Sequence, residues 1–235
     1  MIIMGIFDMF SKKTVLRTEK GKPFKAFDVV ETVKGDFDTF HSKLLKYSLI
    51  MLINGKRGSG KTALGMRLLE LFRKKTKRKS YILGYDSTKL PGWIKKSEAI
   101  EDVPNNAIVL VDEGGLSFSS RDSMKEANKM LGKIMAVARH KNLTLILITQ
   151  NSAMIDLNVL RLADTLLLKE PSLLQSKFER KAIKEMYDKV APHFEKAPDK
   201  QKKFYVWDDE FEGMLSYELS DFWSDKISKS FKNFK

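Results

Sequence analysis

The sequence predicts an α/β domain with a mainly parallel sheet flanked by helices, and three observations support this fold class. Short apolar runs alternate with longer amphipathic segments between residues 49 and 168, a pattern typical of buried strands connected by helices. A glycine-rich loop follows the first apolar run, and two adjacent acidic residues follow a later one. No apolar run approaches the roughly 18 residues that a membrane-spanning helix needs.

The expected elements follow one another along the chain. The apolar runs predict strands at 49–53, 81–85, 107–111, 143–149 and 165–168, and the segments between them predict helices from residue 62, at 124–139 and at 153–162. Proline and glycine punctuate residues 89–106, which we expect to be irregular. The predicted organisation is a basic N-terminal arm with a short covering helix (1–47), a core (48–170) and a small aromatic-rich C-terminal appendage (171–235).

The two ends of the chain carry weaker signals. Residues 36–45 predict the short covering helix, and the apolar residues at the start suggest a loose terminus or a docking peptide. In the appendage we expect a helix that ends at Pro192 and an added strand at 204–207. The aromatic residues that follow are interpreted as packing residues rather than base-stacking platforms: Phe211, Tyr217, Phe222, Trp223, Phe231 and Phe234.

The glycine-rich loop fits the phosphate-binding pattern G-x-x-x-x-G-K-[ST]. It consists of Gly55, Lys56, Arg57, Gly58, Ser59, Gly60, Lys61 and Thr62. Glycines allow a tight turn that brings backbone N–H groups to phosphate oxygens, and the helix that follows directs its positive dipole end at the same anion. We expect Lys61 to bind the β- and γ-phosphates and the Thr62 hydroxyl to ligate Mg²⁺. The loop therefore predicts binding of ATP with Mg²⁺.

Three polar side chains at the ends of later strands predict hydrolysis. Asp112, after the strand at 107–111, is expected to hold Mg²⁺ directly or through water. Glu113 is expected to polarise the attacking water, because transfer to water needs a base aligned with the γ-phosphate. Gln150 follows the strand at 143–149, where an amide contacts both the γ-phosphate and the water.

The composition points to a polyanionic partner. The net charge is +13, which favours nucleic acid first and an anionic membrane second. Six cations fall within seven residues, and they indicate either non-specific binding to the DNA backbone or a solvated helix end: Arg73, Lys74, Lys75, Lys77, Arg78 and Lys79. The absence of cysteine excludes disulfides, thiolate metal sites and cysteine nucleophiles, and it fits a cytoplasmic location.

Four stretches together resemble the HerA/FtsK group of DNA-pumping ATPases. They are the phosphate loop and residues 111–113, 138–140 and 145–150. Within that group the likeness is greatest to the zonular-occludens-toxin-like assembly ATPases of filamentous phages and the genome-packaging ATPases of archaeal viruses, and it covers about residues 48–170. Arg121 and His140 also fall where toxin-like members place such residues.

This resemblance implies properties of fold and assembly. It implies a RecA-like fold of the additional-strand, catalytic-glutamate class, and a ring, usually a hexamer, that drives DNA with ATP. It also suggests a capsid or membrane assembly partner, and a peripheral location at a membrane or procapsid. Arg139 matches the arginine that precedes the fourth strand in this family, so it is the candidate finger that reaches the γ-phosphate of a neighbouring subunit. Arg121 and Arg161 are its rivals.

Two other functions stay open at this point. Lys56 occupies the second loop position, where the deviant loop of partition-type ATPases carries its signature lysine. Arg57 at the third position, together with Glu113 and Gln150, counts against that reading. The other alternative is an assembly or membrane-docking protein in which bound nucleotide acts only as a structural switch.

Overall fold

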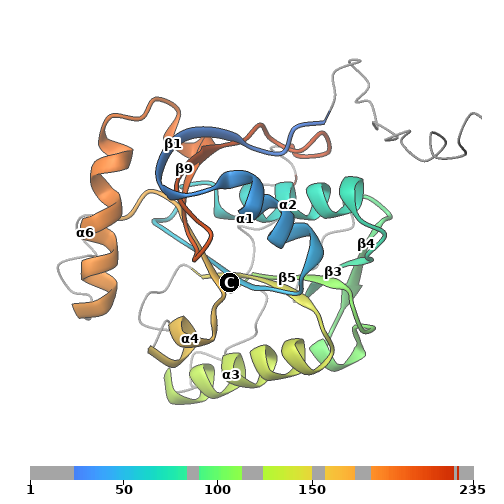
Figure 1. Ribbon diagram of the computed structural model, residues 1–235. Helices are drawn as coiled ribbons and strands as arrows, with labels where there is room; N and C mark the ends of the chain where they lie inside the picture. The colour runs from blue at the N-terminus through green and yellow to red at the C-terminus, as the bar shows by residue number, and fades with distance from the viewer. Residues whose placement is uncertain are drawn as a thin grey trace, which may run out of the picture.

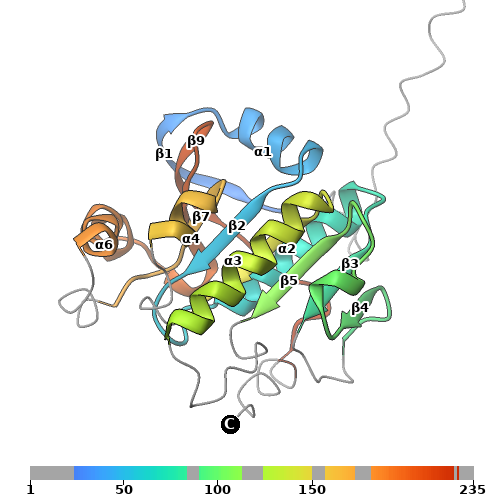
Figure 2. The same ribbon diagram turned by 90° about the horizontal axis from the view of Figure 1, so that it is seen from below.

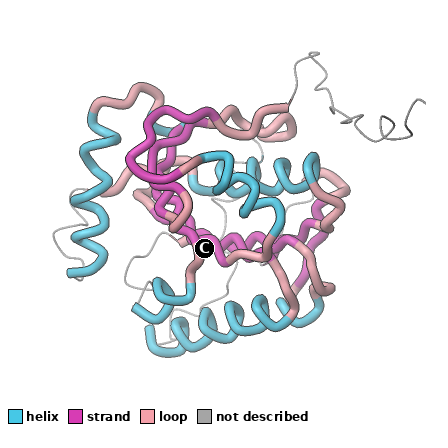
Figure 3. Tube along the Cα trace, viewed as in Figure 1, coloured by secondary structure: helices cyan, strands magenta, loops and turns pink. Residues whose placement is uncertain are grey.

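The computed structural model describes residues 24–83, 90–112, 124–149, 157–172, 181–224 and 227. Within these residues the strands form one sheet in the order β1-β9-β8-β7-β2-β6-β5-β3-β4, and helices cover both of its faces (Figures 1 and 3). The strands are β1 (Asp28–Gly35), β2 (Ile50–Asn54), β3 (Ser80–Leu83), β4 (Ile94–Ser97), β5 (Ile108–Asp112), β6 (Thr144–Ile148), β7 (Thr165–Leu168), β8 (Lys203–Trp207) and β9 (Phe211–Ser216). The α-helices are α1 (Phe37–Lys46), α2 (Lys61–Lys75), α3 (Met124–His140), α4 (Leu157–Leu162) and α6 (Lys181–Glu195).

The middle of the sheet is parallel, as the sequence predicts. Strands β7, β2, β6, β5, β3 and β4 pair parallel with one another in that order. Strands β2, β5 and β6 are buried at every position, which explains why each is a continuous apolar run without alternation. Strand β6 lies between β2 and β5, so an additional strand separates the strand that precedes the glycine-rich loop from the strand that ends in Asp112.

Two hydrophobic cores fill the space between the sheet and its helices. On one face, α1 and α2 contribute residues such as Phe40 and Phe72 to the first core. On the other face, α3, α4 and α6 contribute residues such as Met135, Val159 and Val190 to the second. Figure 2 shows α2 and α3 on opposite sides of β2 and β5. In the described part of the chain, no helix combines the length and apolarity needed to cross a membrane.

The structure corrects three expectations about the secondary structure. Residues 94–97, expected to be irregular, form the edge strand β4. Its central residues, Lys95 and Lys96, are exposed, so the sequence shows no apolar run there. Strand β1 was not expected, because all of its residues are exposed. Pro192 lies inside α6 instead of ending it. The buried Val190 and Phe194 hold this last turn against the second core, which offsets the hydrogen bond that a proline cannot donate.

The ends of the chain extend the central sheet. The covering helix expected at 36–45 is α1, and the strand expected at 204–207 is β8. Strands β7, β8, β9 and β1 pair antiparallel in succession. One sheet thus includes strands from both sides of residues 47 and 170, where the sequence analysis divides the chain. The division at these two positions stays a prediction.

Candidate nucleotide-binding site

The glycine-rich loop joins the buried strand β2 to helix α2 at the carboxyl edge of the sheet. Gly58 and Gly60 have φ angles of 77° and 90°, which glycine adopts without the penalty that a Cβ would add. Gly60 is the N-cap of α2, and a glycine has no side chain to accept from the first N–H groups of the helix. These N–H groups have no partner within a helix and favour an anion. The loop therefore has the backbone geometry of a phosphate site.

The Lys61 side chain folds back onto the start of this loop. Its Nζ donates to the carbonyl oxygens of Gly55 at 2.8 Å and Lys56 at 2.9 Å, and only 5% of the residue is exposed. Ser59 is also buried, and its Oγ finds no hydrogen-bond partner within the described part of the chain. A buried cation and an unpartnered hydroxyl in one glycine-rich loop fit an anionic ligand that supplies acceptor oxygens.

Thr62 and Asp112 meet at the start of α2. The Thr62 Oγ1 donates to Asp112 Oδ2 at 3.1 Å, and Asp112 is buried at the end of β5. Mg²⁺ binds oxygen ligands and is usually held by one or two carboxylates together with phosphates and water. The described residues contain no cluster of three or more acidic or histidine side chains that would form a complete protein cage. The hydroxyl and carboxylate fit the predicted Mg²⁺ site, which needs few protein ligands.

Glu113 and Gln150 lie outside the described residues. The residues directly before them, Asp112 and Thr149, are described, and both lie at the carboxyl edge of the sheet. Asp112 pairs with Ile148 across β5 and β6, and the Thr149 N–H donates to the Ile53 carbonyl at 3.1 Å. The residues directly before both predicted positions thus lie at the edge of the sheet that carries the loop.

Lys56 contacts an acidic side chain of its own chain. Its Nζ lies 2.7 Å from Glu170 Oε2, and its N–H donates to the Glu170 carbonyl at 3.0 Å. Lys200 approaches the other carboxylate oxygen at 3.3 Å. Arg57 is exposed. The second loop position therefore anchors the loop to the residues after β7.

Arg139 lies far from the phosphate loop of the same chain. It is in the last turn of α3, which leads into the amino end of β6, whereas the loop lies at the carboxyl edge. Its Nη2 donates to the Leu162 carbonyl at 2.7 Å and approaches Asp164 Oδ1 at 3.4 Å. Its rival Arg161 is exposed on α4, and Arg121 lies outside the described residues. A role for Arg139 at a phosphate would thus require another subunit.

The cluster of six cations after α2 divides into two groups. Arg78 is half-buried and donates to the carbonyls of Asn106 at 2.8 Å and Ala107 at 3.1 Å, and burial lowers its pKa to about 10. Lys74 pairs with Glu70 and Asp221, each at 3.1 Å. The other four are exposed: Arg73, Lys75, Lys77 and Lys79. Arg78 and Lys74 are structural, so the cluster offers fewer free cations than the sequence suggests.

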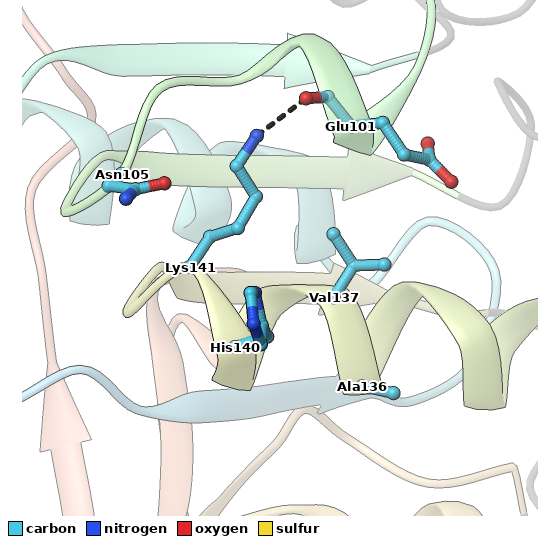
Figure 4. A pocket seen from close by; sticks show the side chains of 6 residues that line it. All are labelled: Glu101, Asn105, Ala136, Val137, His140 and Lys141. Atoms are coloured by element: carbon cyan, nitrogen blue, oxygen red, sulfur yellow. Dashed lines mark hydrogen bonds between the residues drawn. The ribbon is translucent and has the colours of Figure 1, made fainter.

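A shallow pocket of about 570 Å³ lies near the end of α3, at the edge of the sheet opposite the phosphate loop (Figure 4). Its lining residues are Glu101, Asn105, Ala136, Val137, His140 and Lys141. The Lys141 Nζ donates to the Glu101 carbonyl at 2.5 Å and spans the opening. His140, which the family resemblance singled out, lines this pocket and does not contribute to the phosphate loop.

Sequence reasoning missed the residues that contact the loop from the C-terminal part of the chain. Tyr217 donates to the Gly60 carbonyl, Gln201 donates to the Gly58 carbonyl, and the buried Lys169 lies against Gly55. One signal was available, because Lys169 follows the apolar run at 165–168 directly. A charged residue at the end of a buried strand is a candidate for the same sheet edge as the loop.

The fold and the loop define the class of protein. The phosphate loop lies between β2 and α2, and Asp112 ends β5, which β6 separates from β2. This is the arrangement of a P-loop ATPase of the additional-strand class. The sequence matches the zonular occludens toxin (Zot) family over residues 64–183, just over half of the chain, and the protein belongs to that family. The match begins two residues after Thr62, so the phosphate loop precedes it.

Solved structures share this fold. The genome-packaging NTPase B204 of Sulfolobus turreted icosahedral virus 2, in complex with AMP, superimposes with a TM-score of 0.53 at 14% identity, covering 73% of this chain and 98% of that one. The pCW3 conjugation coupling protein TcpA gives a TM-score of 0.53 at 12% identity, covering 81% and 66% respectively. The comparison with curated protein sequences gave no match. At these identities the likeness establishes the fold.

Proposed function

We propose that the protein hydrolyses ATP and uses the free energy to move DNA through a ring of identical subunits, for genome packaging or export. The observation that carries this proposal is the meeting of Thr62 and Asp112 at 3.1 Å beside the buried Lys61. These three groups lie where a phosphate loop and the end of a second strand converge, which is the arrangement that phosphoryl transfer requires.

Each residue has a distinct role in the proposed reaction. The loop N–H groups and Lys61 bind the β- and γ-phosphates, and Thr62 and Asp112 would hold Mg²⁺, which neutralises charge on the phosphate oxygens. Glu113 polarises the attacking water, and Gln150 orients that water against the γ-phosphate. Loop dipoles and the N-terminus of α2 stabilise negative charge without rearrangement during the reaction.

Charge and the functions of two structural neighbours favour DNA as the partner. The net charge of +13 suits binding directed at the phosphate backbone and independent of sequence. One neighbour is a viral genome-packaging NTPase and the other a conjugation coupling protein. A packaging or export motor would also engage a capsid or membrane assembly partner and act in the cytoplasm, peripherally at that assembly.

The partition-type alternative fits the structure less well. Lys56, which would be its signature lysine, is paired with Glu170 of the same chain at 2.7 Å. The intervening strand β6 is typical of the additional-strand class instead. The nucleotide-switch alternative differs in turnover, because a switch binds ATP without continuous hydrolysis.

The test is steady-state ATP hydrolysis with and without DNA. A translocating motor is expected to hydrolyse ATP with Mg²⁺ and to accelerate when DNA is added, and Lys61→Ala is the matched inactive control. Tight ATP binding without hydrolysis, with or without DNA, would favour the nucleotide switch. Hydrolysis that DNA leaves unchanged would retain the ATPase and reject DNA as the partner.

A further inference from the structure

Two carbonyl groups of the phosphate loop accept hydrogen bonds from the C-terminal part of the chain. The Tyr217 hydroxyl, directly after β9, lies 3.1 Å from the Gly60 carbonyl oxygen. The Gln201 Nε2, in the 3₁₀ turn before β8, lies 3.3 Å from the Gly58 carbonyl oxygen. Tyr217 is buried, with 2% of its surface exposed. Residues on either side of the β8–β9 hairpin therefore contact the loop from behind.

The contact at Gly60 is too close to admit a side chain at that position. A Cβ built on Gly60 would lie 2.8 Å from the Gln201 carbonyl oxygen and 3.3 Å from the Tyr217 hydroxyl. The Tyr217 hydroxyl is also 3.1 Å from that same Gln201 carbonyl, so its one proton is shared between the carbonyl oxygens of Gly60 and Gln201. Tyr217 N–H donates to the Lys202 carbonyl at 2.9 Å. The turn at 200–202 and Tyr217 thus form one unit packed against the last glycine of the loop.

Lys169 fixes this unit to the strand next to the loop. Its Nζ donates to the carbonyl oxygens of Gln201, at 2.8 Å, and Lys203, and it lies 4.9 Å from the centre of the Tyr217 ring. Its N–H donates to the Asn54 carbonyl at 2.7 Å, and its Cβ packs against Gly55. Only 1% of Lys169 is exposed. One buried side chain therefore links the start of the loop to the segment that contacts its end.

Contacts to the loop carbonyls bear on phosphate binding because peptide groups are planar and trans. The carbonyl of one residue and the N–H of the next point in opposite directions. The Gly60 carbonyl oxygen accepts the first helical hydrogen bond of α2 from the Leu64 N–H at 3.0 Å, and the Tyr217 hydroxyl is a second donor to it. Together these contacts hold the Lys61 N–H in the opposite direction, toward the N-terminal end of α2 where an anion binds. A loop held in this way loses less conformational freedom when the anion binds.

We propose that Tyr217 and Gln201, fixed in place by Lys169, are positioning residues that hold the phosphate loop ready for the nucleotide. In this view the C-terminal hairpin is part of the nucleotide site although none of its residues contacts the phosphates. The inference rests on the proposed function only for the identity of the ligand, ATP. It assigns no step in hydrolysis to either residue.

The test compares two buried tyrosines of the same hairpin. Tyr217→Phe removes only the hydroxyl that contacts Gly60. Tyr205→Phe is the matched control, because Tyr205 is equally buried on β8 and its hydroxyl donates to Glu212 at 2.6 Å, away from the loop. The dissociation constant of a fluorescent ATP analogue with Mg²⁺ is measured for each, together with the thermal midpoint without nucleotide. Gln201→Ala tests the second contact.

Tyr217→Phe is expected to weaken nucleotide binding about 2- to 10-fold, the range for one net hydrogen bond, while Tyr205→Phe leaves it unchanged. Tyr205→Phe should lower the thermal midpoint at least as much as Tyr217→Phe, because it loses a hydrogen bond to a carboxylate. A loss of affinity confined to Tyr217→Phe therefore separates positioning from general destabilisation. Unchanged affinity in both Tyr217→Phe and Gln201→Ala would overturn the proposal, and so would an equal loss in Tyr205→Phe. A wild-type protein that binds the analogue but does not hydrolyse ATP would refute the proposed function and leave this comparison intact.

Discussion

Lys61 and Glu113 are proposed to act at different steps, so their substitution should separate nucleotide binding from turnover. Glu113→Gln keeps the size of the side chain and removes the base, and we expect ATP to bind while hydrolysis falls about 10²-fold or more. Lys61→Ala should instead weaken binding, because it removes the cation inside the loop. Analogue titration and phosphate release measure the two steps. Glu98→Gln changes an exposed carboxylate directly after the edge strand β4 and is the control. Wild-type turnover in Glu113→Gln would refute the assignment of the base.

Lys169 should make stability depend on pH. Burial first, and the neighbouring charge of Lys61 second, lower its pKa from 10.5 to about 7. Between these two values the unfolded chain holds a proton that the folded chain has released, so the free energy of unfolding contributed by this group rises with pH. Below pH 7 both states are protonated and the contribution is constant.

This dependence can be isolated with the variant Lys169→Met. Urea unfolding at pH 7 and pH 8.5 should show the wild type gaining stability relative to the variant, by at most about 1.4 kcal/mol per pH unit. An equal response of both proteins to pH would show that Lys169 keeps an ordinary pKa in the folded state.

At the scale of elements, the cations at and after the end of α2 can be tested for a part in DNA binding. Three exposed lysines are free to contact a phosphate backbone, whereas Arg78 and Lys74 are engaged within the fold. Replacing Lys75, Lys77 and Lys79 by glutamine should lower the slope of log affinity against log salt by up to about 3, one for each lost phosphate contact.

A matched set of lysines controls for the loss of net charge. Lys181, Lys184 and Lys196 lie on or just after α6, away from the end of α2 (Figure 1), and their replacement removes the same charge. Binding is measured by fluorescence anisotropy with duplexes of unrelated sequence. An equal effect of both triple variants would mean that the cluster after α2 has no special part in binding.

The elements differ in how far the sequence specifies them. The central strands were predictable because burial on both faces requires continuous apolar runs, as in β5 and β6. Strand β1 was not, since it is exposed at every position and its pairing with β9 is set by residues far away in the chain. At the site, the loop and Asp112 are local motifs. Tyr217 and Gln201 contact the loop only through tertiary packing, for which no local pattern exists.

At the scale of the whole molecule, catalysis is expected to need a second subunit. If Arg139 acts at a γ-phosphate, that phosphate must belong to a neighbouring subunit, because in its own chain Arg139 lies at the opposite edge of the sheet from the loop. Specific ATPase activity should therefore rise with protein concentration as rings form. Arg139→Ala should bind ATP normally and fail to hydrolyse it, since charge on the γ-phosphate then lacks its stabilising arginine.

Mixing variants distinguishes a neighbour's arginine from other effects. A mixture of Arg139→Ala with Lys61→Ala should recover part of the activity, because some interfaces then pair an intact loop with an intact arginine. Arg161→Ala is the control for losing an exposed cation nearby. Failure to recover on mixing would count against Arg139, and activity independent of concentration would count against the ring.

The antiparallel pairing of β1 with β9 has a consequence for how the chain folds as it is made. Residues 28–35 leave the ribosome early, yet their partner strand ends at Ser216. Contacts so distant in sequence form slowly and only after the later segment has emerged. The sheet can be completed beyond β7 only after β8 and β9 have been synthesised. A nascent chain paused before residue 203 would therefore leave β7 as an unpaired edge strand, open to pairing with other chains.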